Sequence, residues 1–279
     1  MTYSILLLKD NKNDNIEKAK QLLEEVGQKF SRSFAFDTCD LSASNDEIIK
    51  KAKSAHAVLL GEYTPALRGI CKELGLYASV RRVGDCLLVH DAFGGIYDGE
   101  KGFRNNPTFG REAYDVESYS ELEIERVARI AYELSPSRHI TLIDKADELA
   151  TSKLWRKIVT DINEDYPFVN VDMVSIESAL GALIENPAHD TLLTTHLFGD
   201  IIYSALSAKP TTLISTSEAS QQSKSNEVAA LLGDTTLGMY IIPNSPLRAN
   251  QQSNRNEVAA FMLRHSFDMH TEADYIESL

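Results

Sequence analysis

Hydrophobic positions recur with two different spacings along the chain. Across residues 15–26 the apolar side chains fall three or four positions apart, as on one face of a helix, and Gly27 closes the stripe. The short runs 4–8 and 57–61 are almost entirely apolar, which is typical of parallel strands buried on both faces. Because helical and strand patterns alternate along most of the chain, we expect an α/β fold with a central sheet flanked by helices.

Cap signals and apolar runs predict further elements. Ser44 with Glu47, and Ser120 with Glu123, have the spacing of a capping box, in which each side chain satisfies a backbone N–H at a helix start. The expected strands are 34–39, 86–89, 139–143, 169–174 and 191–194, and the expected helices are 120–134, 151–163, 176–185, one that begins at Asp200, and a last one at about 256–265. Residues 93–110 are rich in glycine and aromatic side chains and too long for an ordinary connection, which indicates a segment with a role of its own.

One internal repeat interrupts this alternation. Residues 221–230 recur as residues 251–260 with eight of ten positions identical. The two copies could be polar loops at helix N-termini, where free backbone N–H groups hold an anion or a carbonyl group. They could also be two helices with the same cap, or a local duplication. A solenoid needs at least three units, so we favour the second interpretation.

Composition narrows the class of protein. A chain of 279 residues with 43% hydrophobic content suits one large or two medium globular domains. The net charge of -13 argues against nucleic acid or an anionic membrane surface as a partner, because binding to either needs a protein surface rich in Lys and Arg. Cys39, Cys71 and Cys86 lack the paired spacing of a zinc site or a disulfide framework, which favours reduced thiols and a cytoplasmic location. The apolar run 5–8 is too short for an export signal or a membrane span.

Three reactive groups stand at the ends of successive expected elements: the phenol of Tyr119, the amine of Lys145 and the carboxylate of Asp200. Together they suit metal-assisted acid–base chemistry, in which side chains move protons while a cation stabilises oxygen charge. Each also has a simpler interpretation. Lys145 can be a solvated lysine at a helix start, Tyr119 a packed aromatic side chain, and Asp200 a helix N-cap.

The motifs around these residues carry a family resemblance. Their order and spacing resemble those of the β-decarboxylating dehydrogenases, in the isocitrate/3-isopropylmalate dehydrogenase family, of which the chain would be a shortened and divergent member. The resemblance is strong over about 94–202, weaker over 1–89 and patchy after 204. It is carried by Tyr119-Ser120, Glu123-Ile124-Glu125-Arg126, Ile143-Asp144-Lys145-Ala146, Leu154-Trp155-Arg156, Asp165-Tyr166-Pro167, Asn186-Pro187 and Phe198-Gly199-Asp200-Ile201.

The resemblance implies an architecture and a reaction. It implies two α/β domains, one from 1–83 with 214–279 and one from 84–213, and a clasp arm at about 93–118 that interlocks the two subunits of a homodimer. It also implies oxidative decarboxylation of a small 2-hydroxy acid, similar to 3-isopropylmalate, with NAD and Mg²⁺ or Mn²⁺. Lys145 would be the base and Tyr119 the acid. Because both groups have an ordinary pKa above neutral, a working site must lower the pKa of at least one.

The implied metal site is altered. The family binds its cation with two aspartates four residues apart on one helix and a third from the neighbouring subunit. Asp200 matches the first, the second position is Ser204, and the intersubunit position is Glu177. Two carboxylates still suit a hard cation, although we expect weaker binding.

The implied substrate and cofactor sites are altered further. The three arginines with which the family grips substrate carboxylates fall on Cys71, Arg81 and His90, so a single guanidinium group remains. The loop 9–15 has no glycine for a close approach to the nucleotide, and the later nucleotide loop falls on 243–248 without the family's motif. Asn256 alone matches an adenine-side residue of the family.

Two functions fit these observations. The first is a divergent, active dehydrogenase that uses NAD and Mg²⁺ or Mn²⁺. The second is a non-catalytic homologue, either a dimerising or regulatory subunit or a binder of a small carboxylate, whose nucleotide site has degraded.

Overall fold

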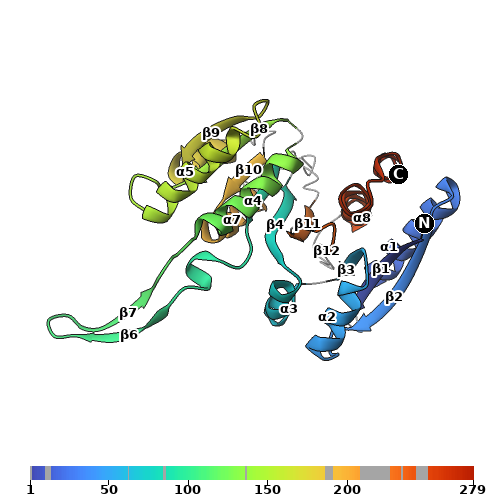
Figure 1. Cartoon of the computed structure of the whole chain (residues 1–279), viewed down its shortest axis with the longest axis horizontal. Helices are drawn as coiled ribbons and strands as arrows, with labels where there is room; N and C mark the ends of the chain where they lie inside the picture. The colour runs from blue at the N-terminus through green and yellow to red at the C-terminus, as the bar shows by residue number, and fades with distance from the viewer. Residues whose placement is uncertain are drawn as a thin grey trace, which may run out of the picture. The chain divides into compact units, whose positions relative to one another are not determined.

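The computed structural model describes residues 2–9, 14–61, 63–83, 86–135, 137–185, 191–207, 227–233, 235–242 and 251–279. The chain forms two compact units, Met1–Gly84 with Ser223–Leu279, and Asp85–Gln222 (Figure 1). Each unit has strands flanked by helices, which confirms the predicted α/β class.

The first unit has mainly parallel strands in the order β2-β1-β3-β12-β11-β4. β11 is the exception, because it runs antiparallel to both β12 and β4. Strands β1 and β3, which contain the expected apolar runs, are buried on both faces from Ile5 to Leu8 and from Ala57 to Leu60. The elements of this unit are β1 (Thr2–Lys9), α1 (Asp14–Phe30), β2 (Ser33–Asp40), α2 (Asn45–Lys53), β3 (Ala57–Leu60), α3 (Arg68–Glu73), β4 (Leu76–Val83), β11 (Glu227–Gly233), β12 (Gly238–Ile241), α8 (Gln251–Phe267) and α9 (His270–Glu277).

The two copies of the repeat adopt different structures. In the first copy the described residues belong to strand β11, whereas the second copy opens helix α8. The interpretation as two helices is therefore wrong. Val258, Ala259 and Ala260 are fully buried in α8, which packs against β11, β12, α1 and α9. Tertiary packing, which a local pattern does not contain, decides the conformation of this segment.

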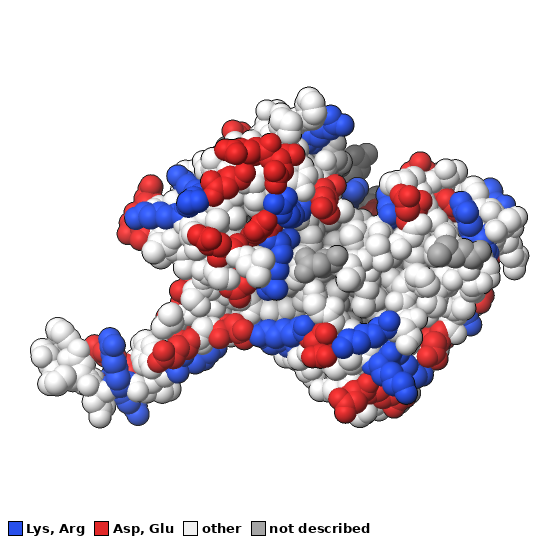
Figure 2. All heavy atoms as spheres, in the orientation of Figure 1, with Lys and Arg blue, Asp and Glu red and all other residues white. Residues whose placement is uncertain are grey.

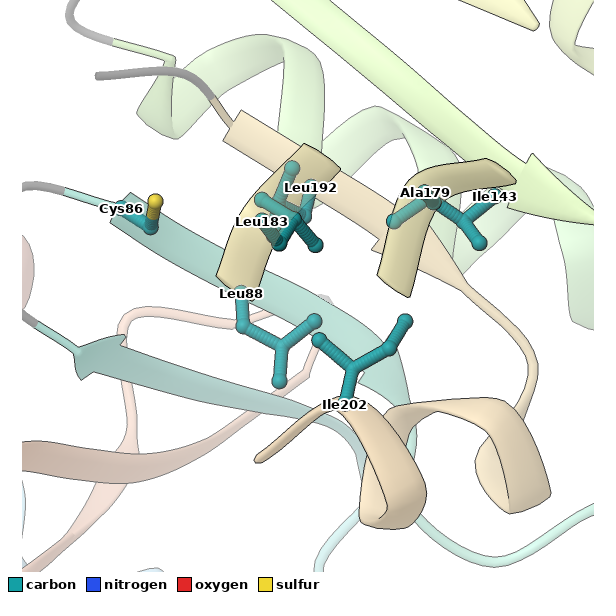
Figure 3. Packing of buried hydrophobic residues seen from close by; sticks show 7 residues of the cluster. All are labelled: Cys86, Leu88, Ile143, Ala179, Leu183, Leu192 and Ile202. Atoms are coloured by element: carbon teal, nitrogen blue, oxygen red, sulfur yellow. The ribbon is translucent and has the colours of Figure 1, made fainter. Parts of the chain in front are cut away.

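The second unit has four parallel strands in the order β5-β10-β8-β9. Helices α6 and α7 cover a core built from β5, β8 and β10, in which the side chains of Leu88, Ile143, Leu192 and Ile202 converge (Figure 3). The elements are β5 (Cys86–Asp91), α4 (Glu121–Leu134), β8 (His139–Asp144), α5 (Ala150–Asn163), β9 (Asn170–Ser175), α6 (Ile176–Glu185), β10 (Thr191–Thr194) and α7 (His196–Ser207).

The glycine-rich segment forms an arm on the second unit. Its strands β6 (Lys101–Asn106) and β7 (Gly110–Asp115) pair as an antiparallel hairpin, which extends away from the helices of that unit in Figure 1. Phe103 and Phe109 are 77% and 82% exposed on this hairpin. A two-stranded ribbon is marginally stable alone in water, so the arm suits a packing partner. The homodimer stays a prediction.

Two predicted helix boundaries differ from the structure. The helix expected to begin at Asp200 begins at His196, whose backbone N–H is accepted by the Tyr119 hydroxyl from another element. The helix expected to be last is followed by α9, because Asp268, with a φ of +54°, turns the chain back. The start of α7 depends on a contact with a distant residue, and the end of α8 depends on a left-handed backbone conformation. The spacing of hydrophobic residues predicts neither feature.

Charge is mixed over the surface. Lys and Arg side chains are interspersed with Asp and Glu on the face drawn in Figure 2. Among the described helices, none has the length and apolar character that crossing a membrane requires.

The capping box of α4 yields a stability prediction. The Ser120 hydroxyl accepts the backbone N–H of Glu123, whose carboxylate accepts the Ser120 backbone N–H in return. We expect Ser120→Ala to lower the free energy of unfolding by about 1 kcal/mol, because a helix N-terminus loses its acceptor. Chemical denaturation measures this change. Ser118→Ala, an exposed serine two residues earlier, is the control; equal stability of the two variants would contradict the prediction.

Candidate active site

The predicted site residues of the second unit lie in two groups. Tyr119, His90 and Asp200 surround His196, where the ends of β5 and β10 meet the start of α7. Lys145 and Glu177 form an ion pair between the end of β8 and the first turn of α6. We call the first group, completed by Asp91 and Tyr97, the His196 cluster.

Tyr119 is held by a hydrogen bond and a ring contact. Its hydroxyl accepts the backbone N–H of His196 at 3.0 Å, and its ring meets Trp155 edge-on with the centroids 5.5 Å apart. Burial, followed by the nearby carboxylate of Asp91, raises the pKa of the phenol well above its ordinary value. Tyr119 therefore keeps its proton near neutral pH and gives it up less readily than an ordinary phenol, which is the opposite of the shift expected for a working acid.

Two glycines give the Tyr119 ring its space. A Cβ at Gly95 would overlap the phenol, and one at Gly94 would lie 3.2 Å from a ring carbon. Gly95 also has a φ of +67°, a conformation that L side chains rarely adopt. The Gly94-Gly95 pair at the entry to the arm thus permits the Tyr119 hydroxyl to reach α7.

His90 occupies a packed position at the end of β5. Its side chain is almost fully buried, and its Nδ1 lies 2.7 Å from the carbonyl oxygen of Asp91. A Cβ at Gly199 would overlap the imidazole, so the glycine of the Phe-Gly-Asp motif admits this ring beneath α7. The geometry gives His90 a packing role, and its binding of a substrate carboxylate stays a prediction.

Asp91, for which no sequence motif predicts a role, is fully buried. Its Oδ2 accepts the backbone N–H groups of Phe93, at 3.2 Å, and of Gly94. Burial raises the pKa of this carboxyl group to about 6, although the backbone donors oppose the shift. Asp91 therefore holds the start of the arm against the end of β5.

His196, which the sequence analysis also gave no role, connects the cluster. Its Nδ1 lies 3.3 Å from the carbonyl oxygen of Gly94 and 3.9 Å from Asp91 Oδ2, while its Nε2 lies 3.8 Å from Asp200 Oδ2. The Tyr97 ring meets the imidazole edge-on, with the centroids 4.5 Å apart. The four-residue spacing of His196 and Asp200 would have predicted their contact on one helix face. The helix expected from the sequence begins only at Asp200, so His196 lay outside it.

Asp200 and Ser204 lie one turn apart on α7 but do not form a pair of ligands. The Ser204 hydroxyl donates to the backbone carbonyl of Asp200 at 2.8 Å, a common bond for serine inside a helix. Burial and then the charge of Asp200, with which it also forms a hydrogen bond, raise the pKa of Tyr97. Within the described part of a single chain, no three His, Cys, Asp or Glu side chains are grouped to hold a metal ion.

The Lys145–Glu177 pair changes the acid–base properties of both groups. The hydrogen bond between them raises the pKa of the Lys145 amine and lowers the pKa of the Glu177 carboxyl group. A base needs the opposite shift of the lysine pKa. Lys145 is therefore protonated as long as Glu177 binds it.

The predicted residues of the first unit have separate surroundings. Arg81, on β4, donates from Nε to the Ser79 hydroxyl at 3.2 Å. The Cys71 thiol is fully buried, 3.8 Å from the Met239 sulfur, and burial raises its pKa to about 12, so it offers a carboxylate no charge. Asn256 is buried in α8, and its amide points at the carbonyl oxygen of Ile276 in α9 at 3.5 Å.

Most of the expected nucleotide loops lies outside the described residues. Of the segment 9–15, the structure describes Lys9 at the end of β1 and residues 14–15 at the start of α1. Lys9 forms an ion pair with Glu17 of α1. All of 243–248 falls outside.

Comparisons with known proteins agree on one family. The model of the isocitrate/isopropylmalate dehydrogenase family matches residues 64–278. The 3-isopropylmalate dehydrogenase of Clostridium acetobutylicum is 31% identical over 316 aligned positions, which cover 94% of this chain and 85% of that protein. The enzyme of the same name from Pseudoalteromonas translucida is 45% identical over 121 residues, which are 42% of this chain and about a third (34%) of its own length.

A solved structure supports the fold. The isocitrate dehydrogenase of Methylococcus capsulatus superimposes with a TM-score of 0.72 and 20% identity, covering 99% of this chain and 91% of that one. At this identity the likeness concerns the architecture alone.

The buried carboxyl group of Asp91 yields a prediction about pH. The pKa of Asp91 is about 6 in the folded protein, which is higher than in the unfolded chain. Below about pH 4 the carboxyl group is protonated in both states and costs no stability. Above about pH 6 it is ionised in both states, and the buried charge destabilises the fold. We expect Asp91→Asn to raise the free energy of unfolding by about 1–3 kcal/mol at about pH 8, and to leave it nearly unchanged at about pH 4. Denaturant titrations at both pH values measure this, with the exposed Asp268→Asn as control. A gain that is equal at both pH values would contradict it.

Proposed function

Because this chain belongs to the isocitrate/isopropylmalate dehydrogenase family, we propose that it is a divergent dehydrogenase that oxidises and decarboxylates a small 2-hydroxy acid similar to 3-isopropylmalate, with NAD and Mg²⁺ or Mn²⁺. The observation that carries the proposal is the arrangement of the acid–base residues. Tyr119 is buried with its proton and accepts the His196 backbone N–H, and Lys145 is paired with Glu177. Both pKa values are raised, whereas proton transfer near neutral pH needs at least one of them lowered, so the site requires a nearby cation or the release of Lys145 from Glu177.

The two proton-transfer side chains have different tasks. Tyr119 carries its proton near neutral pH and donates it to the carbon that loses CO₂, a step for which a nearby cation would have to lower its raised pKa. Lys145 accepts the substrate hydroxyl proton, which requires that its ammonium first leave Glu177 and lose a proton. The Lys145–Glu177 ion pair thus holds the base inactive, and release from Glu177 lowers the pKa of Lys145.

The carboxylates that would hold a divalent cation are Asp200 and Glu177. Both side chains are accessible, at 40% and 59% exposure, and carboxylate oxygens suit Mg²⁺ or Mn²⁺. Such a cation supplies positive charge for the oxygen anions of the reaction.

The ion pair also constrains a shared site. If Glu177 completes the site of Asp200 from a second copy of the chain, it brings Lys145 with it, because the two side chains bind each other within one subunit. The base and the acid would then come from different subunits of the proposed homodimer.

The nucleotide residues support the family reaction less well. Asn256, the adenine-side match, has its amide turned toward the Ile276 carbonyl oxygen, so this side chain connects α8 to α9 inside the first unit. The neutral, buried Cys71 likewise takes the place of one guanidinium group in the substrate grip. These two observations favour the second candidate function, a non-catalytic homologue that dimerises, regulates or binds a small carboxylate.

An assay of the full chain decides between the two functions. We expect metal-dependent reduction of NAD with 3-isopropylmalate or a related 2-hydroxy acid. The rate should fall by about 10²–10⁴-fold in Lys145→Met and in Tyr119→Phe, since each variant lacks one proton-transfer group. Lys157→Met, which removes an exposed lysine of α5 paired with Asp161, is the control and should keep the rate.

A different result supports the second candidate. If no pair of hydroxy acid and nucleotide yields a reduced cofactor, the dehydrogenase proposal fails. A rise in melting temperature with the hydroxy acid, lost in Arg81→Gln, would then identify a carboxylate binder.

A further inference from the structure

Helix α7 offers Asp200 a ligand partner on its other side. At four residues after Asp200 stands Ser204, whose hydroxyl is bonded to the backbone. At four residues before it stands His196, whose Nε2 lies 3.8 Å from Asp200 Oδ2. Residues four apart share one face of a helix, so both side chains can hold the same ion. We propose that His196 and Asp200 form the divalent-cation site of this helix, with one nitrogen and one oxygen ligand.

The surroundings of His196 orient its ring for this role. Both acceptors near Nδ1, the Gly94 carbonyl and the Asp91 carboxylate, favour the tautomer with the proton on Nδ1. In the neutral ring, Nε2 then carries the lone pair and faces Asp200. A metal-binding histidine characteristically donates its other N–H to a carbonyl or carboxylate group in this way.

The distance between the two ligands leaves room for an ion. At 3.8 Å, Nε2 and Oδ2 are farther apart than the roughly 2.7–3.2 Å of a hydrogen bond. Two ligands at about 2.1 Å from a tetrahedral ion lie about 3.4 Å apart, so small side-chain rotations bring this pair to a cation. Tyr97 restrains both ligands, since its ring contacts His196 and its hydroxyl bonds to Asp200.

The mixed ligand pair has a consequence for metal choice. Imidazole nitrogen binds Zn²⁺, Co²⁺ and Ni²⁺ more strongly than Mg²⁺, whereas paired carboxylates suit Mg²⁺ and Mn²⁺. Without substrate, this site should therefore bind Zn²⁺, Co²⁺ and Ni²⁺ more tightly than the Mg²⁺ or Mn²⁺ of the proposed reaction. Water, substrate or Glu177 of a second copy fills the other coordination positions. The inference goes beyond the proposed function, because the ion binds whether or not the chain turns over substrate.

Metal titrations without substrate or nucleotide test the site. With the full chain and Co²⁺, Zn²⁺ or Mg²⁺ salts, calorimetry should give at least about tenfold tighter binding of Co²⁺ and Zn²⁺ than of Mg²⁺. His196→Asn should lose at least about tenfold of its Co²⁺ and Zn²⁺ affinity, since a nitrogen ligand is removed. The matched control is His139→Asn, which removes a histidine of the same unit that lies 3.1 Å from Asp172.

A second variant reverses the preference. His196→Asn combined with Ser204→Asp restores a carboxylate pair on α7, and we expect it to bind Mg²⁺ more tightly than His196→Asn alone does. If either variant unfolds, NMR of isotope-labelled imidazoles in the unmodified chain gives the answer, because Zn²⁺ should shift one histidine Nε2 signal. Unchanged Co²⁺ and Zn²⁺ affinity in His196→Asn, equal affinity for Mg²⁺, or absence of binding at millimolar metal would each overturn the proposal. None of these outcomes depends on catalytic activity, so loss of the proposed reaction does not affect the test.

Discussion

The hydrogen bond from the His196 backbone N–H to the Tyr119 hydroxyl organises the second unit of this protein. It supplies an acceptor to the N-terminus of α7 from a residue 77 positions earlier in the chain. A helix fixed at its first residue has its next turns fixed as well, so Asp200 and Ser204 take their places from this contact. The glycines at the start of the arm leave the space that the tyrosine ring needs.

Two carboxylates lie near this hydrogen bond, and the charge of Arg126 acts on one of them, Asp91. Asp91 and Asp200 lie on opposite sides of the His196 ring, and Tyr119 is protonated. Two carboxylates repel an anionic substrate, so such a substrate binds here only if a cation lies between it and the carboxylates. In the proposed function, the His196 cluster would therefore bind a cation before it binds a hydroxy acid. The positive charge of Lys145 is neutralised by Glu177 and does not offset these carboxylates while the ion pair is intact.

Much of the fold could be predicted from the sequence because its signals are local. Apolar runs such as the one in β3 and the capping box at Ser120 depend on neighbouring residues, and both were confirmed. The start of α7 could not be predicted, because a distant phenol accepts its first N–H. The family motifs predict roles for Tyr119, Lys145 and Asp200, which stay predictions, and they carry no signal for Asp91 or His196. The roles of these last two arise from burial and contact, which a pattern of residue types does not encode.

The repeated segment has a consequence for substitutions in the first unit. Among the described residues, the four at 227–230 form part of a strand, whereas the four identical ones at 257–260 form part of a helix. Because these residues are the same in both copies, their tertiary surroundings decide which conformation each copy takes. The same substitution therefore alters a strand in one copy and a helix in the other.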